Sequence, residues 1–203
     1  MELLIDKLIK DSYLRTPEII KAFGAIRRKD FLPEEYITEE SVNAPLPIGH
    51  GQTNSQPLTV AFMMELLSPQ TGQKILDIGS GSGWTTALLA QIVGPTGQVF
   101  AIERIAELKE FGEKNVRKFK FSNVEFLCQD GSNGLPNQAP FDRILVSAAA
   151  FEIPEFLKTQ LKIGGRLVIP TADEDIRLII RDSEDNYLET IYPGFLFVPL
   201  ISE

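Results

Sequence analysis

The distribution of apolar residues divides the chain into two parts. In residues 1–70, apolar positions recur at helical spacing over residues 2–10, after Thr16-Pro17, and from Pro57 to Leu67. Residues 30–53 contain prolines and glycines in close succession and are predicted to be loop. The first part of the chain is therefore expected to consist of helices joined by loops.

After Gly72 the pattern changes to short runs of Val, Ile and Leu that alternate with helical segments. This alternation is typical of a parallel sheet covered on both faces. Two further apolar runs, 176–181 and 195–200, predict an antiparallel pair that closes the sheet. The predicted strands before them are 74–78, 98–102, 124–127, 143–147 and 166–169, and the predicted helices are 84–92, 105–119 and 154–161.

The pattern predicts an α/β fold. We expect a Rossmann-like, doubly wound, mostly parallel sheet with an antiparallel C-terminal strand pair and an N-terminal helical extension. A length of 203 residues suits one domain. We therefore expect a single domain over residues 1–203, in which residues 1–70 form the extension and residues 71–203 form the core.

Charge and composition limit the possible partners. The formal net charge is -8, which argues against binding to nucleic acids or anionic membranes. One cysteine and one histidine are too few for a zinc site, so no metal is expected, and Cys128 in its apolar run is predicted to be buried. The chain starts without a basic region followed by an apolar core, so we expect a cytoplasmic protein. Nothing in the sequence demands an oligomer, and monomer is the default.

The most informative motif is the loop Asp77-Ile78-Gly79-Ser80-Gly81-Ser82-Gly83, which follows the first predicted strand of the core. Ligands of open parallel sheets bind beyond the carboxyl ends of the strands. Alternate glycines let the backbone turn tightly and approach a ligand closely. A plain strand-to-helix turn is the alternative, but it needs one glycine and not three.

The identity of the nucleotide depends on spacing. The dinucleotide pattern has a third glycine where this chain has Trp84, which argues against a pyrophosphate. Asp77, two residues before the first glycine, suits a ligand with a cationic amino group. The pattern D-x-G-x-G-x-G resembles that of S-adenosylmethionine-dependent methyltransferases, which implies cofactor contacts by Asp77, Gly79, Ser80, Gly81 and Gly83.

Two later strand ends fit the same cofactor. Glu103 ends the second strand and could accept hydrogen bonds from both ribose hydroxyls. A solvated glutamate is the alternative, but it is weaker beside the glycine loop. Asp130-Gly131 follows the third strand and could bind the adenine amino group. Taken alone, Asp130-Gly131 is more often a turn, but its place after the third strand, in the expected order, favours a contact with the cofactor.

The acceptor is indicated upstream, by Pro47-Ile48-Gly49-His50-Gly51-Gln52-Thr53-Asn54-Ser55-Gln56-Pro57. This segment resembles the signature of protein-L-isoaspartate O-methyltransferases. Further similar stretches keep the same order along nearly the whole chain, among them 28–33, 139–142, 164–170 and 197–200. Asn54 departs from the family pattern, which usually has an apolar residue there.

The resemblance implies transfer of a methyl group from S-adenosylmethionine to the α-carboxylate of isoaspartyl residues in damaged proteins and peptides, with S-adenosylhomocysteine as product. It implies that Ser55 is the active-site serine and that Gln52, Thr53, Asn54 and Ser55 line the isoaspartyl pocket. The simpler interpretation of Ser55 is a cap for the helix at Pro57, and both can hold.

An isoaspartyl carboxylate is ionised at pH 7, because such groups titrate near ~3.5, and it needs no general base. We therefore expect a positioning or surface role for His50 instead of catalysis. Three alternatives stay open: a nicotinamide-dependent oxidoreductase, a cofactor-binding module without isoaspartyl activity, and a methyltransferase redirected to another carboxylate.

Overall fold

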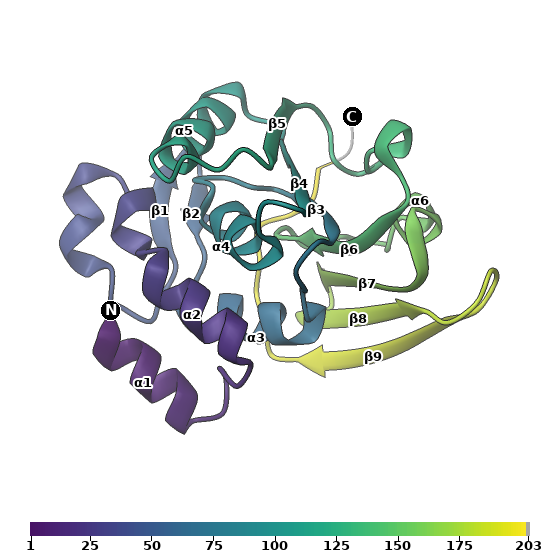
Figure 1. Ribbon diagram of the computed structural model, residues 1–203, viewed down its shortest axis with the longest axis horizontal. Helices are drawn as coiled ribbons and strands as arrows, with labels where there is room; N and C mark the ends of the chain where they lie inside the picture. Colours follow the sequence, from purple (N-terminus) through teal and green to yellow (C-terminus); the bar gives the residue numbers. More distant parts are fainter. Residues whose placement is uncertain (202–203) are drawn as a thin grey trace.

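The computed structural model describes residues 1–201 and contains a seven-stranded sheet (Figure 1). The spatial order is β5-β4-β3-β6-β7-β8-β9. The strands from β5 to β7 in that order pair in parallel, β8 pairs antiparallel with β7, and β9 pairs antiparallel with β8. The bounds are β3 Lys74–Ile78, β4 Gln98–Glu103, β5 Val124–Cys128, β6 Phe141–Val146, β7 Leu161–Thr171, β8 Asp175–Arg181 and β9 Tyr187–Pro193. The predicted fold class is confirmed.

The two faces of the sheet carry cores of different size. Successive residues of a strand point to opposite faces, so neighbouring residues belong to different cores. Ile75 of β3 belongs to a large core formed with the N-terminal helices and the helix after β3, whereas Leu76 belongs to a smaller core on the other face. The helices are α1 Glu2–Lys10, α2 Pro17–Ala25, α3 Pro57–Leu67, α4 Trp84–Val93, α5 Ala106–Arg117 and α6 Glu155–Thr159. Of these, α6 contributes Leu157 to the smaller core.

The strand order reverses beside β3. From β3 the chain moves outward to β4 and β5, and then returns to the opposite side of β3 for β6 and β7. Such a switch point leaves a crevice beyond the carboxyl ends of the strands. In this protein the crevice lies above β3, β4 and β6, where the glycine loop begins.

The prediction for the last strand was wrong. The partner of β8 is β9, Tyr187–Pro193, and residues 195–200 form only an isolated bridge between Pro199 and Ala149. A short turn joins β8 to β9, in which Asp182 N donates to Asn186 O at 2.9 Å. Strand β9 is an edge strand with mostly exposed residues, so its apolar signal is weaker than that of residues 195–200.

The prediction of loop over residues 30–53 was also wrong in part. This region contains two 3-10 helices, η1 Arg28–Phe31 and η2 Glu34–Glu39, and the hairpin β1 Leu46–Gly49 with β2 Gln52–Asn54. At the hairpin turn, residues 49, 50 and 51 all have positive φ. Glycine adopts this conformation readily, so the glycines that predicted loop in fact form a tight turn.

The burial predicted for Cys128 was wrong, because the residue is exposed. It ends β5, the edge strand of the sheet opposite β9. Its apolar run resembles a central strand, but an edge strand keeps one side open to solvent. The sequence alone does not show which strand takes the edge.

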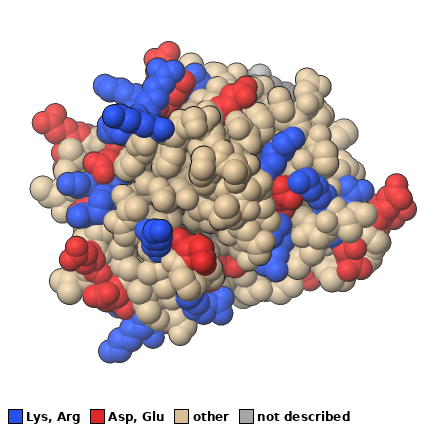
Figure 2. All heavy atoms as spheres, viewed as in Figure 1, with Lys and Arg blue, Asp and Glu red and all other residues tan. Residues whose placement is uncertain are grey.

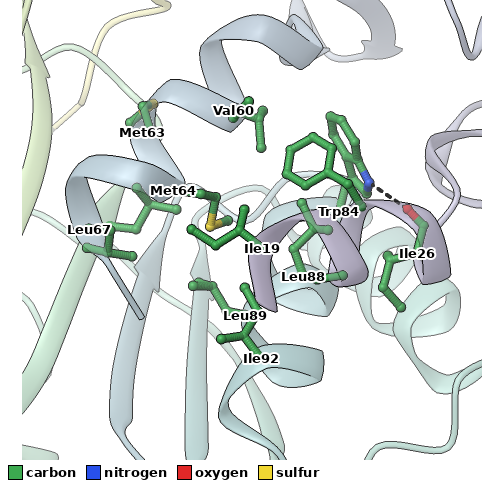
Figure 3. Close-up of a cluster of buried hydrophobic side chains, with 14 of the residues drawn as sticks. Ile19, Ile26, Val60, Met63, Met64, Leu67, Trp84, Leu88, Leu89 and Ile92 are labelled. Carbon is green, nitrogen blue, oxygen red and sulfur yellow. Dashed lines mark hydrogen bonds between the residues drawn. The ribbon is translucent and has the colours of Figure 1, made fainter. Parts of the chain in front are cut away.

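The N-terminal extension packs on helix α4 (Figure 3). Trp84, the first residue of α4, is 2% exposed, and its ring makes an edge contact with Phe23 of α2 at 5.6 Å between centroids. Its indole Nε1 donates to the backbone oxygen of Ile26 at 3.2 Å, as the dashed line shows. Trp84 directly follows the glycine loop, so its side chain connects the N-terminal extension to that loop.

Candidate active site

A cleft opens at the carboxyl ends of the parallel strands. Its empty space, including the solvent at its open mouth, is about 920 Å³. The cleft brings together residues that are far apart in sequence. Its walls come from the acceptor segment 52–55, the glycine loop 78–82, residues 102–105 after β4, Gly131, residues 147 and 148 after β6, and the tail 198–201.

The glycine loop has a conformation that requires glycine. Gly79, Gly81 and Gly83 have φ of 77°, 50° and 86°, a region that side chains disfavour. The amides of Gly79 and Ser80 donate to Ile102 O at 2.9 and 3.1 Å, which ties the loop to β4. Gly79, Ser80 and Gly81 line the cleft, whereas Gly83 caps α4 behind it.

Glu103 lines the cleft at the end of β4 and is 6% exposed. Its Oε2 accepts from Gly81 N at 3.0 Å and its Oε1 accepts from Ile105 N at 3.0 Å. Each oxygen keeps a second lone pair. The carboxylate thus fixes the loop against β4 and still has capacity for hydroxyl donors in the cleft.

Asp77 lies beneath the loop, behind the walls of the cleft. Its Oδ2 accepts from the hydroxyls of Thr85 at 2.9 Å and Thr86 at 2.6 Å, while its Oδ1 is buried without a hydrogen-bond partner among the described residues. Burial raises the pKa of Asp77 to about 6 against the opposing effect of the two hydroxyls, and the charge of Glu103 adds to the rise. A positive charge above the loop would stabilise this carboxylate.

Asp130 and Gly131 have separate positions. Asp130 accepts from Ser132 N at 2.8 Å and from Ser132 Oγ at 2.9 Å, which shapes the turn around Gly131, and its side chain is not part of the cleft lining. Gly131 lines the cleft. A side chain at Gly131 would place Cβ 2.4 Å from Ile78 Cγ2, so the backbone can approach β3 only because this residue is glycine.

The acceptor segment lines the same cleft as the glycine loop and contacts that loop directly. All four predicted residues, Gln52, Thr53, Asn54 and Ser55, line it. Asn54 is 3% exposed, and its Nδ2 donates to Ser82 Oγ at 2.9 Å. The N-cap of α3 is Gln56, so the interpretation of Ser55 as the helix cap was wrong. His50 is exposed at the hairpin turn and lies outside the cleft.

Some cleft residues were missed in the sequence. Arg104, Ile105, Ser147 and Ala148 follow the carboxyl ends of β4 and β6, a position that the strand-end rule would have indicated. The tail 198–201 gave no such signal. It is held by Ala149, whose N donates to Val198 O and whose O accepts from Leu200 N, both at 2.7 Å.

Metal ligands are not clustered in the described part of the chain. Among residues 1–201, no group of three or more His, Cys, Asp or Glu side chains is placed to hold an ion.

Comparison with known proteins decides the family. The profile of the family described as protein-L-isoaspartate(D-aspartate) O-methyltransferase matches residues 1–203. The chain belongs to this family. It is therefore a class I S-adenosylmethionine-dependent methyltransferase. This family membership argues against the nicotinamide-dependent oxidoreductase.

Curated relatives named protein-L-isoaspartate O-methyltransferase match over most of their length. The protein of Methanopyrus kandleri is 41% identical over 206 residues, which cover 100% of this chain and 91% of the relative. The protein of Aeropyrum pernix is 43% identical, and the match covers 98% of this chain and 78% of the relative.

Solved structures agree on the fold. One protein-L-isoaspartate O-methyltransferase has a TM-score of 0.88 at 29% identity; the match covers 99% of this chain and 66% of that longer chain. A structure from Plasmodium falciparum, whose description names a complex with S-adenosyl-L-homocysteine, has a TM-score of 0.86 at 22% identity and covers 98% of this chain and 96% of its own.

Proposed function

We propose that this chain, like its family, transfers a methyl group from S-adenosylmethionine to the α-carboxylate of L-isoaspartyl residues in damaged proteins and peptides. The observation that carries the proposal is the cleft, which the glycine loop and the segment Gln52–Ser55 line together. A methyl donor and an acceptor carboxylate must meet in such a place. The family match over the full chain supports the same conclusion.

The residues at the loop fit this cofactor. S-adenosylmethionine is a cation that supplies an electrophilic methyl group when bound. Gly79, Ser80 and Gly81 offer a close backbone approach, and the buried Oγ of Ser80 lacks a partner among residues 1–201. We assign the ribose to Glu103 and the adenine to Gly131.

Three predicted cofactor residues act from behind the cleft in this proposal. Asp77 favours positive charge above the loop, because its carboxylate is buried and its Oδ1 has no hydrogen-bond partner within residues 1–201. Gly83 permits the close contact of the loop with α5, where an added Cβ would lie 2.8 Å from Gly112 O. Asp130 shapes the turn that presents Gly131.

The acceptor needs orientation more than activation. Its carboxylate is already ionised at neutral pH, so the chain must hold it in line with the methyl group and exclude water. We assign hydrogen-bond donation to the carboxylate to Ser55 and Thr53, and a lining role to Gln52. This division explains how a site without a histidine in its walls can support catalysis.

We also propose that residues 1–203 act as one domain and as a monomer in the cytoplasm, without nucleic-acid or membrane partners. The contact of Trp84 with Ile26 supports a joint unit. On the face in Figure 2, Lys and Arg lie among Asp and Glu around an uncharged centre, which differs from the basic patch of a nucleic-acid binder. No helix within residues 1–201 has the length and apolar character needed to span a bilayer.

Methyl transfer to paired peptides tests the function. The protein is incubated with methyl-labelled S-adenosylmethionine and a peptide that contains isoaspartate, beside the same peptide with normal aspartate. We expect a base-labile methyl ester on the isoaspartyl peptide alone. Equal labelling of both peptides would indicate a redirected methyltransferase, and labelling of neither would indicate a module that binds cofactor without this activity.

A further inference from the structure

Arg28 is a fully buried cation at the start of η1, with 0% of its surface exposed. Among residues 1–201 it forms no salt bridge with a carboxylate. Burial lowers the pKa of Arg28 to about 10, so the guanidinium stays charged at pH 7 to 8. Because an isolated charge opposes burial, its surroundings must compensate it with hydrogen bonds.

The compensating acceptors belong to the two ends of one segment, 42–55. Before the β1–β2 hairpin, Nη1 donates to Val42 O and Nη2 to Ala44 O, both at 2.8 Å. After the hairpin, Nε donates to Asn54 Oδ1 at 2.7 Å, and Nη2 donates to Asn54 O at 3.1 Å and Ser55 O at 3.0 Å. One planar side chain therefore holds both ends of the segment that forms the acceptor wall.

The same arginine also connects this segment to the cofactor loop. Its guanidinium carbon lies 5.6 Å from the centre of the ring of Trp84, the residue that directly follows the loop in sequence. Asn54, whose Oδ1 accepts from Arg28, donates through Nδ2 to Ser82 Oγ at 2.9 Å. Arg28 thus contacts both walls of the cleft while lying outside its lining.

Given the function proposed above, we propose that Arg28 is the positioning residue of the acceptor site. It fixes the carbonyl of Ser55, and through it the Ser55 hydroxyl, relative to the loop that holds the methyl donor. A displacement of about 1 Å in such a pair of reactants can lower the rate roughly a hundredfold. The role differs from general stabilisation because only the acceptor step depends on this alignment.

A second buried arginine provides a matched control. Arg143 is 8% exposed, and its donors also go to backbone oxygens, Ser68 O at 3.2 Å and Asp142 O at 2.7 Å, but these lie away from the cleft. The variants Arg28→Lys and Arg143→Lys both keep the charge and lose the planar fork. A merely structural role would make the two variants behave alike.

The test measures kcat and KM with an isoaspartyl peptide, the Kd of S-adenosylhomocysteine, and Tm for each variant. For Arg28→Lys we expect kcat to fall at least about tenfold while Kd changes less than about threefold. For Arg143→Lys we expect both values within about threefold of the wild type, even where Tm falls equally. Unchanged kcat in Arg28→Lys, or a Kd that weakens in proportion to kcat, would overturn the proposal.

If Arg28→Lys does not fold, Asn54→Ala decides, with Asn123→Ala as its control. Asn123 is likewise buried, and its Nδ2 donates to Ala90 O and Gly94 O away from the cleft. We expect a fall in kcat with retained Kd for Asn54→Ala alone, and unchanged kcat would refute the positioning role. Wild-type activity is measured first, because its absence would contradict the proposed function and not the role of Arg28.

Discussion

The carboxylate of Asp77 lies where burial opposes its charge. It is fully buried, and one of its oxygens has no hydrogen-bond partner among residues 1–201. Its raised pKa, about 6, means that the folded ligand-free protein holds a proton more tightly than the unfolded chain, whose value is near 3.8. The group therefore contributes stability that is fully present below pH 3.8 and is lost as pH rises through 6.

The first prediction concerns Asp77→Asn. Two units of pKa correspond to about 3 kcal/mol, so the free energy of unfolding of the ligand-free wild type should fall by up to about 3 kcal/mol more than that of the variant between pH 4 and pH 8. Urea unfolding at the two pH values measures this difference. The Kd of S-adenosylhomocysteine should weaken in the variant at pH 8. Identical pH dependence in both proteins would contradict the burial argument.

The second prediction concerns Ser55→Ala. Ser55 is half-buried and lines the cleft. Loss of a hydrogen bond to a charged group costs about 1.5–3 kcal/mol, so turnover should fall about 10- to 100-fold. Cofactor binding should be retained, as measured by calorimetry with S-adenosylhomocysteine. The matched control is Ser183→Ala in the β8–β9 turn, which should behave as wild type. Full activity of the Ser55 variant would remove this residue from the site.

At the scale of elements, helix α5 and the glycine loop meet at two glycines. A Cβ at Gly112 would lie 2.5 Å from Gly81 O, and a Cβ at Gly83 would lie 2.8 Å from Gly112 O. Asn115, one turn later, donates to Ser82 O at 3.1 Å. The position of α5 therefore sets the shape of the cofactor loop.

The third prediction follows from this contact. Gly112→Ala should push α5 from the loop, cost about 1–3 kcal/mol of stability, and weaken S-adenosylhomocysteine binding about tenfold. Gly24→Ala is the control, because Gly24 is also helical and a Cβ there meets nothing within 4 Å. It should stabilise the protein by about 0.5–1 kcal/mol and leave binding unchanged. Equal effects of the two variants would refute the role of the contact.

The sequence predicted the elements better than their edges. The strands β3, β4 and β6 are mostly buried and mostly apolar, and their positions were predicted within two residues at each end. Cys128 and Tyr187–Pro193 lie on edge strands, where the alternation is weak and the partner is set by tertiary packing. The short helices η1 and η2 and the β1–β2 hairpin escaped prediction because their turn residues resemble loop.

The site was predictable where a continuous segment both carries the sequence motif and forms a wall of the cleft. Gly79, Gly81 and Gln52–Ser55 were found from sequence and line the cleft. Nothing in the sequence distinguishes Arg28 from a surface residue, because it stands in a charged stretch and its hydrogen-bond acceptors are distant in sequence. The cleft contribution of residues 198–201 depends on a long-range pairing with Ala149, which periodicity does not reveal.

At the scale of the whole molecule, the cleft predicts ligand-dependent stability. At a concentration 100 times Kd, a ligand specific for the native state adds about 2.7 kcal/mol, and a protein of this size gains roughly 2–4 °C in Tm per kcal/mol. Saturating S-adenosylhomocysteine should therefore raise Tm by about 5–10 °C, and NAD should not raise it. The readout is differential scanning fluorimetry. A comparable shift with NAD would contradict the assignment of the loop.

The most direct measurement is a crystal structure of the complex with S-adenosylhomocysteine and an isoaspartyl peptide. We expect the product in the loop at Gly79–Gly81 with its ribose at Glu103. We expect the isoaspartyl α-carboxylate within hydrogen-bonding distance of the Ser55 hydroxyl and directed at the sulfur. A carboxylate bound away from Ser55, or a cofactor product bound outside this cleft, would contradict the claim that the two reactants meet here.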